Sequence, residues 1–202
     1  MATLIKAVIF DQGGVLSLGG EKGTNEKAAT RAIGLRETIV VPKLLDDLKR
    51  GRIDNNIFVQ EVNRLYPDAP NVLTDKMWDD VYLSLKPERV AYDFAGKCHA
   101  AGLHVGLLSN INPAIAARLH KDGSYKGFDP LILSCEVGCA KPDPEIYAKV
   151  EQALPAIRPG EILLLDDQDK CVQGAVNRGW QALKVTSTKQ LVRDASKLLG
   201  FL

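Results

Sequence analysis

The stretch "AVIFDQGGVL", residues 7–16, decides how the rest of the chain is interpreted. Four apolar residues lead directly into Asp11, and the chain then turns at Gly13 and Gly14. A carboxylate at the end of a buried strand is costly unless it is paired or has a chemical role. The glycines let backbone N–H groups come close to a bound anion. The stretch therefore predicts a buried strand with Asp11 at its carboxyl end, in a functional site where Gln12 and Gly13 lie beside a bound anion.

The composition is that of an ordinary globular protein. The 202 residues include 26 basic and 25 acidic side chains, and 46% of them are hydrophobic. A net charge near +1 argues against a nucleic-acid-binding surface, which usually carries a basic excess. No apolar run approaches the ~20 residues of a membrane span, and the short run before Asp11 does not resemble a signal peptide. We therefore expect no nucleic-acid partner and no membrane partner.

The cysteines indicate the cellular compartment, and the apolar tail concerns the oligomeric state. The four cysteines lack the paired CxxC spacing of a zinc site, which favours free thiols in a reducing compartment. A cytoplasmic protein is therefore expected. The tail "LLGFL", residues 198–202, fits either a final packed helix or a contact surface, so the expected state is a monomer or a homodimer.

Short apolar runs alternate with helical patterns from residue 87 onward. This alternation is typical of a parallel sheet with crossover helices. The expected strands are "IKAVIF" (5–10), "LHVGLL" (103–108), "PLIL" (130–133), "EILLL" (161–165) and "WQALKV" (180–185). The sequence thus predicts an α/β fold with a doubly wound, mainly parallel sheet, whose ligands bind beyond the carboxyl ends of the strands.

Residues that typically begin and end helices support the prediction of crossover helices between the strands. One helix is expected to follow Pro87 and to stop at Gly102. A second is expected to have Asp143 as its N-cap, with a proline as its first residue. A third is expected to run from about Asp169, as N-cap, to Gly179.

Residues 16–86 have a different pattern. Their helical segments are "NEKAATRAIG" (25–34), "VPKLLDDLKRG" (41–51), "NNIFVQEVNRLY" (55–66) and "TDKMWDDVYLSL" (74–85), and no strand is expected among them. About 70 residues of helix are too many for one crossover, so they are expected to form an inserted cap. The predicted division is a core of residues 1–15 and 87–202 and a helical cap of residues 16–86.

Polar residues follow or separate the expected strands at four places. They are Asp11, the pair Ser109 and Asn110, Lys141, and the pair Asp166 and Asp167. In a sheet of this kind the strand ends converge on one crevice. Carboxylates gathered there repel one another unless a cation neutralises them, and oxygen ligands suit Mg²⁺.

This set of residues is consistent with phosphate chemistry. Lys141 can offset the charge of a phosphate, and Ser109 can donate a hydrogen bond to it. Asp11 can then act as a nucleophile, forming an aspartyl-phosphate that water hydrolyses. The expected ligand is a small phosphorylated metabolite.

The motifs resemble those of the haloacid dehalogenase-like (HAD) hydrolase superfamily. The matching stretches are "VIFDQGGVL" (8–16), "LLSN" (107–110), "AKPDPEIY" (140–147) and "LLLDDQDK" (163–170). The resemblance covers nearly the whole chain. The segments "RGRIDNNIF" (50–58) and "WDDVYLSLKPE" (78–88) resemble the small-capped branch that includes bacterial glucose-1-phosphate phosphatases and the phosphatase-like domains joined to epoxide hydrolases.

The resemblance implies a role for each matching residue. It makes Asp11 the nucleophile and a Mg²⁺ ligand, with Asp167 as the main further metal ligand and Asp166 as a second one or as an outer-shell partner. The carbonyl of Gly13 would complete the metal shell. Ser109 and Lys141 would hold the phosphate, with Gln12 and Gly13 beside it and Asn110 next to the substrate.

Two positions depart from the family pattern. Gly13 stands where the family commonly has an aspartate that protonates the leaving group, a contribution worth roughly 10²–10⁴-fold. Substrates with good leaving groups, such as anomeric or acyl phosphates, depend less on that acid. Cys171 stands where an asparagine or aspartate usually orients the metal shell or the lysine, and its loss is expected to weaken Mg²⁺ binding or misplace Lys141.

Three functions are consistent with these residues. The leading hypothesis is a Mg²⁺-dependent phosphatase for a small phosphorylated metabolite. A phospholigand-binding protein with impaired catalysis is the alternative that Gly13 and Cys171 favour. A 2-haloacid dehalogenase would use the same nucleophile, but it would leave the adjacent Asp166 and Asp167 without a role.

Overall fold

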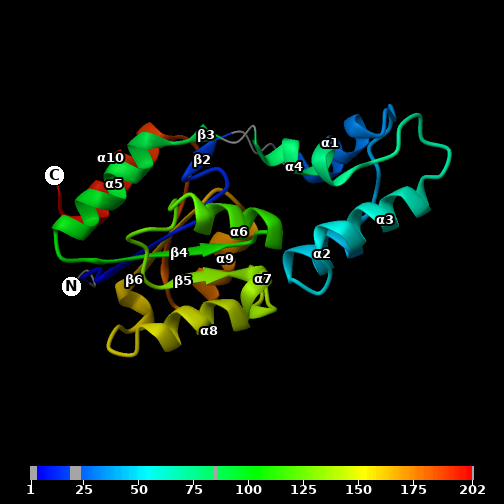
Figure 1. The fold of residues 1–202 in the computed structure, drawn as a ribbon. Coiled ribbons are helices and arrows are strands. Elements are labelled where there is room, and N and C mark those ends of the chain that lie inside the picture. Colours follow the sequence, from blue (N-terminus) through cyan, green and yellow to red (C-terminus); the bar gives the residue numbers. More distant parts are fainter. Residues whose placement is uncertain (1–3, 19–23, 84–85, 202) are drawn as a thin grey trace.

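The computed structural model describes residues 4–18, 24–83 and 86–201. A sheet of five parallel strands forms its centre, in the order β5-β4-β1-β6-β7 (Figure 1). The strands are β1 (Ala7–Phe10), β4 (His104–Ser109), β5 (Leu131–Leu133), β6 (Ile162–Asp166) and β7 (Gln181–Lys184). The α/β class with a parallel sheet, expected from the sequence, is confirmed, and all five strands form where apolar runs were found.

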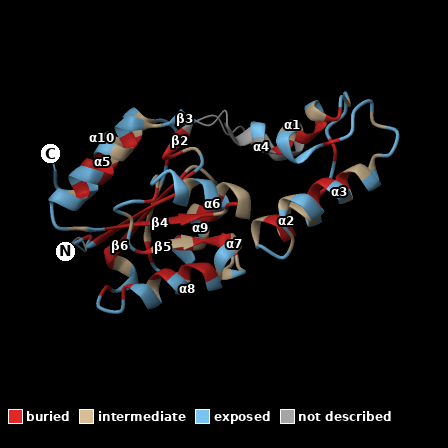
Figure 2. Ribbon diagram, in the orientation of Figure 1, coloured by how far each residue is buried: buried red, intermediate tan, exposed pale blue. Residues whose placement is uncertain are grey.

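Both faces of the sheet are buried under helices, which is why its central strands are continuous apolar runs. Successive side chains of β1 point to opposite faces. Val8 and Phe10 pack in one core cluster, beneath α5 (Arg89–Ala100) and α10 (Thr188–Leu199). Ala7 and Ile9 pack in another, beneath α8 (Pro144–Ala153) and α9 (Asp169–Asn177). Figure 2 shows the buried strands in red between helices whose outer faces are exposed.

Short elements complete the core. They are α6 (Pro113–Lys121), α7 (Ser134–Val137) and the 3₁₀ turn η1 (Pro159–Glu161). The tail ends in α10, with Gly200 as its left-handed C-cap, and the ring of Phe201 lies 6.3 Å from that of Phe94. The last residue of the tail lies outside the described residues. The end of the chain thus packs on α5.

Two expected helix caps differ in the structure. Asp143 occupies the N-cap position of α8, but its side chain makes no capping bond and instead binds Arg50. Asp169 is the first residue of α9 rather than its cap, because Gln168 occupies that position. The Asp169 carboxylate pairs with Lys184, 2.6 Å away. In both cases the carboxylate forms an ion pair with a residue of another element instead of capping its own helix.

Four helices form a separate unit between β2 and β3. They are α1 (Thr24–Ala32), α2 (Pro42–Lys49), α3 (Asn55–Leu65) and α4 (Asp75–Leu83), at the right of Figure 1. Their apolar faces share a third cluster, in which the rings of Phe58 and Trp78 stack with centroids 4.5 Å apart. We call this unit the helical cap. Its own core supports the predicted division of the chain into two domains, which stays a prediction.

The expectation that residues 16–86 contain no strand is wrong. Ser17–Leu18 (β2) and Lys86–Pro87 (β3) form a two-stranded antiparallel ladder where the chain leaves the core and returns to it. Strands of two residues are too short to show an alternating pattern, so the sequence carried no signal for them. The expected helix at 74–85 is present as α4 up to residue 83, and its last two expected positions lie outside the described residues. None of the described helices is long and apolar enough to cross a membrane.

Candidate active site

Three carboxylates meet where β1 and β6 end. The sheet register pairs Phe10 with Leu165, so that Asp11 follows β1 next to Asp166, the last residue of β6. Asp167 comes directly after it. One carboxylate oxygen from each of the three aspartates lies within 4.8 Å of the others. The parallel register therefore brings together acids that the sequence places more than 150 residues apart.

Lys141 lies between two of these acids. Its Nζ is 3.0 Å from Oδ1 of Asp11 and 2.6 Å from Oδ2 of Asp166. The side chains of Lys141, Asp11 and Asp166 are only 1%, 6% and 0% exposed. Because the cluster holds three carboxylates and one lysine, it keeps an excess of negative charge that a divalent cation would offset.

Burial decides how these groups titrate. It raises the pKa of Asp11 to about 7, an effect that Lys141 opposes and Asp166 reinforces. Burial also disfavours the ammonium of Lys141, but Asp11 and Asp166 outweigh it and raise the pKa of the lysine. Lys141 is therefore a permanent cation, whereas the charge of Asp11 depends on what else occupies the site.

Backbone groups hold the carboxylates in place. The N–H of Gln12 donates to Oδ1 of Asp11 and the N–H of Gln168 donates to Oδ1 of Asp166, each at 2.8 Å. Each acid thus has one oxygen on a backbone amide of the following loop. This fixes the orientation of both side chains before any ligand binds.

The two glycines after Asp11 have different roles. Gly14 has a φ of +75°, and a Cβ there would lie 2.6 Å from Cγ of Asp167. Only glycine therefore lets Asp167 approach the loop. At Gly13 a Cβ would meet nothing within 4 Å, and the residue lines the cleft above the carboxylates. The absence of a side chain at Gly13 leaves open space beside the site.

Asn110 positions the loop that carries Lys141. Its Nδ2 donates to the carbonyl of Lys141, and its Oδ1 accepts from the N–H of Lys141, both at 2.8 Å. Ser109 ends β4 and is 2% exposed. Both residues line the cleft, so the structure brings the four sets of sequence-predicted residues to one place.

A cleft of about 850 Å³ lies over this cluster, between the core and the helical cap. Gln12, Asn110 and Gln168, which are hydrogen-bonded to the buried acids and to Lys141, form part of its floor. The wall on the cap side comes from α2, and much of the remaining wall comes from α6. The charged residues that line the cleft are Asp46, Lys49, Arg118, Asp122 and Lys170. The lining is thus mixed in charge, unlike the acidic cluster beneath it.

Sequence reasoning missed the polar contacts that join the cap to the core. Arg50, just after α2, donates from Nη1 to Oδ2 of Asp143 at 2.5 Å and from Nε to Oδ2 of Asp46 at 2.7 Å. Ser134 Oγ donates to the carbonyl of Lys49 at 2.6 Å and accepts from the N–H of Ile111. Only the folded chain shows these pairs, because 93 residues separate Arg50 from Asp143.

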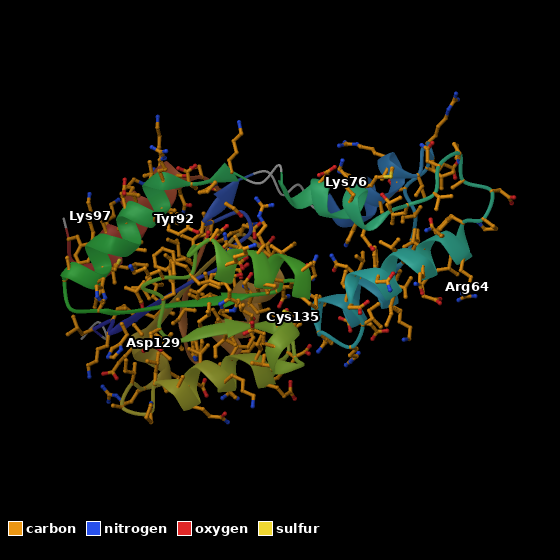
Figure 3. All side chains as sticks on the ribbon, viewed as in Figure 1. Arg64, Lys76, Tyr92, Lys97, Asp129 and Cys135 are labelled. Carbon is orange, nitrogen blue, oxygen red and sulfur yellow. The ribbon has the colours of Figure 1, made fainter. Side chains whose placement is uncertain are left out.

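At Gly51 the backbones of cap and core lie close together. Its φ is +67°, and a Cβ there would lie 2.2 Å from the carbonyl oxygen of Cys135, a residue labelled in Figure 3. The sequence offered one signal for this contact, since a glycine just after a helix commonly adopts this conformation. It gave no indication of the partner.

Cys171 is buried beneath the cluster. Burial raises the pKa of its thiol to about 12, and its carbonyl accepts a hydrogen bond of 2.8 Å from the Tyr147 hydroxyl. The side chain is therefore a neutral thiol. Two ion pairs and both bonds to Asn110 hold Lys141. That Cys171 weakens Mg²⁺ binding or misplaces Lys141 stays a prediction.

The comparison with known families agrees with this geometry. Residues 5–177 match the family model described as haloacid dehalogenase-like hydrolase. The chain belongs to this family. It is therefore a HAD-like hydrolase, as the four motifs predicted.

Two curated relatives illustrate its sequence neighbourhood. Acyl-CoA dehydrogenase family member 10 of Mus musculus is 28% identical over 97% of this chain and 19% of its own length. Phosphatase MT3486 of Mycobacterium tuberculosis (strain CDC 1551 / Oshkosh) is 34% identical over 48% of this chain and 47% of its own. The HAD-like hydrolase chain thus spans less than half of either relative.

Two solved structures share the fold. A HAD-like family hydrolase from Porphyromonas gingivalis has a TM-score of 0.80 at 24% identity, covering 98% of both chains. A HAD family enzyme from Bacteroides thetaiotaomicron, in complex with magnesium and inorganic phosphate, has a TM-score of 0.71 at 23% identity. That match covers 89% of this chain and 93% of the other. These likenesses extend over cap and core together.

Proposed function

We propose that this HAD-like hydrolase is a Mg²⁺-dependent phosphatase that acts on a small phosphorylated metabolite through an aspartyl-phosphate. The observation that carries the proposal is the cluster of Asp11, Asp166 and Asp167 at the ends of β1 and β6, in which Lys141 pairs with Asp11 and Asp166. The phosphatase among the relatives, and the neighbour that binds magnesium and phosphate, support it.

The chemistry of the cluster fits a magnesium ion. Three carboxylates offer oxygen atoms within 4.8 Å of one another, and one lysine leaves their charge in excess. Such oxygen-only sets suit Mg²⁺. We infer that Asp11, Asp166 and Asp167 would hold the ion, together with the carbonyl of Gly13. When bound, the ion neutralises phosphate charge and lets the phosphate approach a carboxylate.

Asp11 is proposed as the nucleophile. One carboxylate oxygen forms a bond to phosphorus while the bond from phosphorus to the leaving-group oxygen breaks. Water then attacks the aspartyl-phosphate, which releases inorganic phosphate and returns Asp11 to a carboxylate. The Nζ atom of Lys141 lies 3.0 Å from Oδ1 of Asp11, so its ammonium can stabilise the negative charge that develops on the phosphate oxygens. Ser109 would donate to the same phosphate.

Gly13 limits which leaving groups depart easily. No side chain at this position can donate a proton to the leaving oxygen, so that proton comes from water. Leaving groups that are stable as anions or hemiacetals need this help least. We therefore propose anomeric or acyl phosphates, including sugar phosphates, as the favoured substrates.

The test is phosphate release from sugar, acyl and nucleotide phosphates by the wild type and by Asp11→Asn, with Mg²⁺ and with EDTA. The wild type should release phosphate only with Mg²⁺, and Asp11→Asn should release none above background. Asp169→Asn is the matched control, since it removes an exposed carboxylate that pairs with Lys184, and it should stay active. A wild type no faster than Asp11→Asn on every substrate rules the proposal out.

The second candidate is a phospholigand-binding protein on the same fold. The observation that favours it is the absence of an acid at Gly13, where the cleft has open space. Such a protein would bind phosphorylated ligands with Mg²⁺ present but would not turn them over. Calorimetric binding together with a null result in the release assay would therefore select this candidate.

A further inference from the structure

The side chain of Gln168 lines the cleft without a partner among the described residues. Six lining residues carry a carboxylate or a carboxamide: Gln12, Asp46, Asn110, Asn112, Asp122 and Gln168. Gln168 is half-buried and occupies the N-cap position of α9, but its side chain makes neither a capping bond nor any other hydrogen bond to a residue that the structure describes. Its oxygen and its amide group are therefore available to a molecule in the cleft.

The acceptor oxygens of the other five residues are engaged, enclosed or distant from the floor. Those of Asn110 and Asn112 accept hydrogen bonds from backbone N–H groups. Oε1 of Gln12 is enclosed by protein atoms. Asp46 pairs with two cations of the helical cap, and Asp122 is the C-cap of α6, about 14 Å along that helix from its start next to β4. Near the buried acids, the cleft thus offers the carboxamide of Gln168.

The backbone holds Gln168 next to those acids. Its N–H donates to Oδ1 of Asp166 at 2.8 Å, and the sheet register places Asp166 beside Asp11. Its carbonyl accepts hydrogen bonds from the N–H groups of Cys171 and Val172, in the first turn of α9. Both backbone groups of Gln168 are therefore fixed, whereas its side chain can adjust to a molecule above the carboxylates.

Gly13 leaves the second step of the proposed reaction without help from its own position. In that step water attacks the aspartyl-phosphate, and no side chain at Gly13 can orient the water. A carboxamide suits this task, because its oxygen accepts a hydrogen bond from water while its amide group donates one to a phosphate oxygen. Glutamine orients the attacking water in other classes of phosphoryl-transfer enzyme.

We propose that Gln168 orients the water that hydrolyses the aspartyl-phosphate, an inference that rests on the proposed phosphatase function. The water oxygen forms a bond to phosphorus, and the bond between phosphorus and the Asp11 oxygen breaks, leaving its electron pair on the carboxylate. Both protons of the water stay on the released phosphate as H₂PO₄⁻, from which solvent takes one. Gln168 neither gains nor loses a proton, and it has no part in the departure of the leaving group.

The experiment compares Gln168→Leu with the wild type on acetyl phosphate and on glucose 1-phosphate, with Mg²⁺ present. Only hydrolysis of the aspartyl-phosphate should slow, so kcat should fall roughly 10–100-fold while kcat/KM, which reports the first step, changes less than about twofold. The variant should have equal kcat values for the two substrates, because both form the same aspartyl-phosphate. Intact-protein mass spectrometry after acid quenching should show the phosphorylated chain accumulating in the variant.

Two further variants separate this role from an effect on folding. Gln173→Leu makes the same change on α9, at an exposed position outside the cleft lining, and should leave kcat and kcat/KM unchanged. Gln168→Glu keeps the chain length and an acceptor oxygen, so its kcat should stay within about threefold of the wild type.

The outcomes distinguish the role of Gln168 from the phosphatase function itself. The role is refuted, and the phosphatase stands, if Gln168→Leu keeps the kcat of the wild type. The same holds if kcat and kcat/KM fall together without accumulation of the phosphorylated chain. If the wild type releases phosphate from neither substrate, the proposed phosphatase fails together with the role of Gln168.

Discussion

The floor of the cleft and its cap-side wall are built on different principles. The floor includes the residues directly beneath its lining, where Asp11, Asp166 and Lys141 are almost completely buried and bind one another. On the cap side, α2 supplies partly exposed side chains of both charges, such as Asp46 and Lys49. The side chains of the floor are therefore held in one geometry by the sheet and by one another. The partly exposed side chains of the wall can adopt several conformations.

The difference separates reaction from selection. A buried, mutually bonded cluster keeps its geometry whatever ligand arrives, which favours chemistry common to a whole family. A partly exposed wall can change residue by residue at little cost to the fold. The comparison predicts that substitutions on the floor change stability and turnover together, whereas substitutions on the cap side change mainly ligand affinity.

The largest effect is expected for Lys141→Met. This substitution leaves three carboxylates together without their buried cation, and breaking a buried pair in this way costs about 3–5 kcal/mol. Urea unfolding in EDTA measures the loss. Phosphate release should also fall by roughly 10²–10³-fold. Unchanged stability in EDTA would show that Lys141 does not neutralise the floor.

Asp11→Asn is the matched variant, because it removes an anion instead of the cation. Since burial raises the pKa of Asp11 from 3.8 to about 7, the stability linked to its protonated form is complete below about pH 4 and is lost as pH rises through about 7. The substituted asparagine does not titrate, so the stability of the variant does not fall in this pH range. In EDTA it should therefore be more stable than the wild type by on the order of 1–2 kcal/mol at pH 8, with the difference vanishing near pH 4. A difference independent of pH would contradict this account.

Gly13→Asp is expected to produce the next largest change, as a gain. A Cβ at Gly13 meets nothing within 4 Å, and the residue lines the cleft, so the backbone there accepts a side chain that can extend into the cleft. It should protonate poor leaving groups and raise the rate on alkyl phosphates by about 100-fold, with little gain on acyl phosphates. Gly13→Asn, equal in size but without an acid, is the control. Equal rates for the two variants would exclude general acid catalysis from this position.

The sheet and its acids could be predicted from the sequence because they depend on local patterns. Four apolar residues before Asp11 and before Asp166 indicate buried strands, and parallel strands bring such ends together. Lys141 could be grouped with them because it lies between two of the expected strands. The contact of Gly14 with Asp167 could not be predicted, since it depends on a loop that is distant in sequence.

The contacts of the cap could not be predicted, for a physical reason. Asp143 has the sequence signature of a helix cap, but Arg50 is a stronger partner for a carboxylate than a backbone N–H. Local signals give the position of such residues, and only the tertiary fold gives the partner.

The smallest effect is expected at the contact between Arg50 and Asp143. The Asp143 side chain is 33% exposed, so solvent screening should limit the coupling energy of this ion pair to about 0.5–1 kcal/mol in a double-mutant cycle. Because Arg50 also binds Asp46 in the cap wall, Arg50→Ala should loosen that wall and raise KM about threefold, with kcat changed less than twofold.

A matched control tests whether the position of this ion pair matters. Arg64→Ala breaks an ion pair with Glu61 within α3, away from the cleft lining, and Arg64 is labelled in Figure 3. It should leave KM unchanged. If Arg50→Ala lowered kcat as much as a substitution on the floor, the separation of reaction from selection would fail. If both arginine variants left KM unchanged, the cap contact would be structural only, and selection would rest with the residues of the core wall.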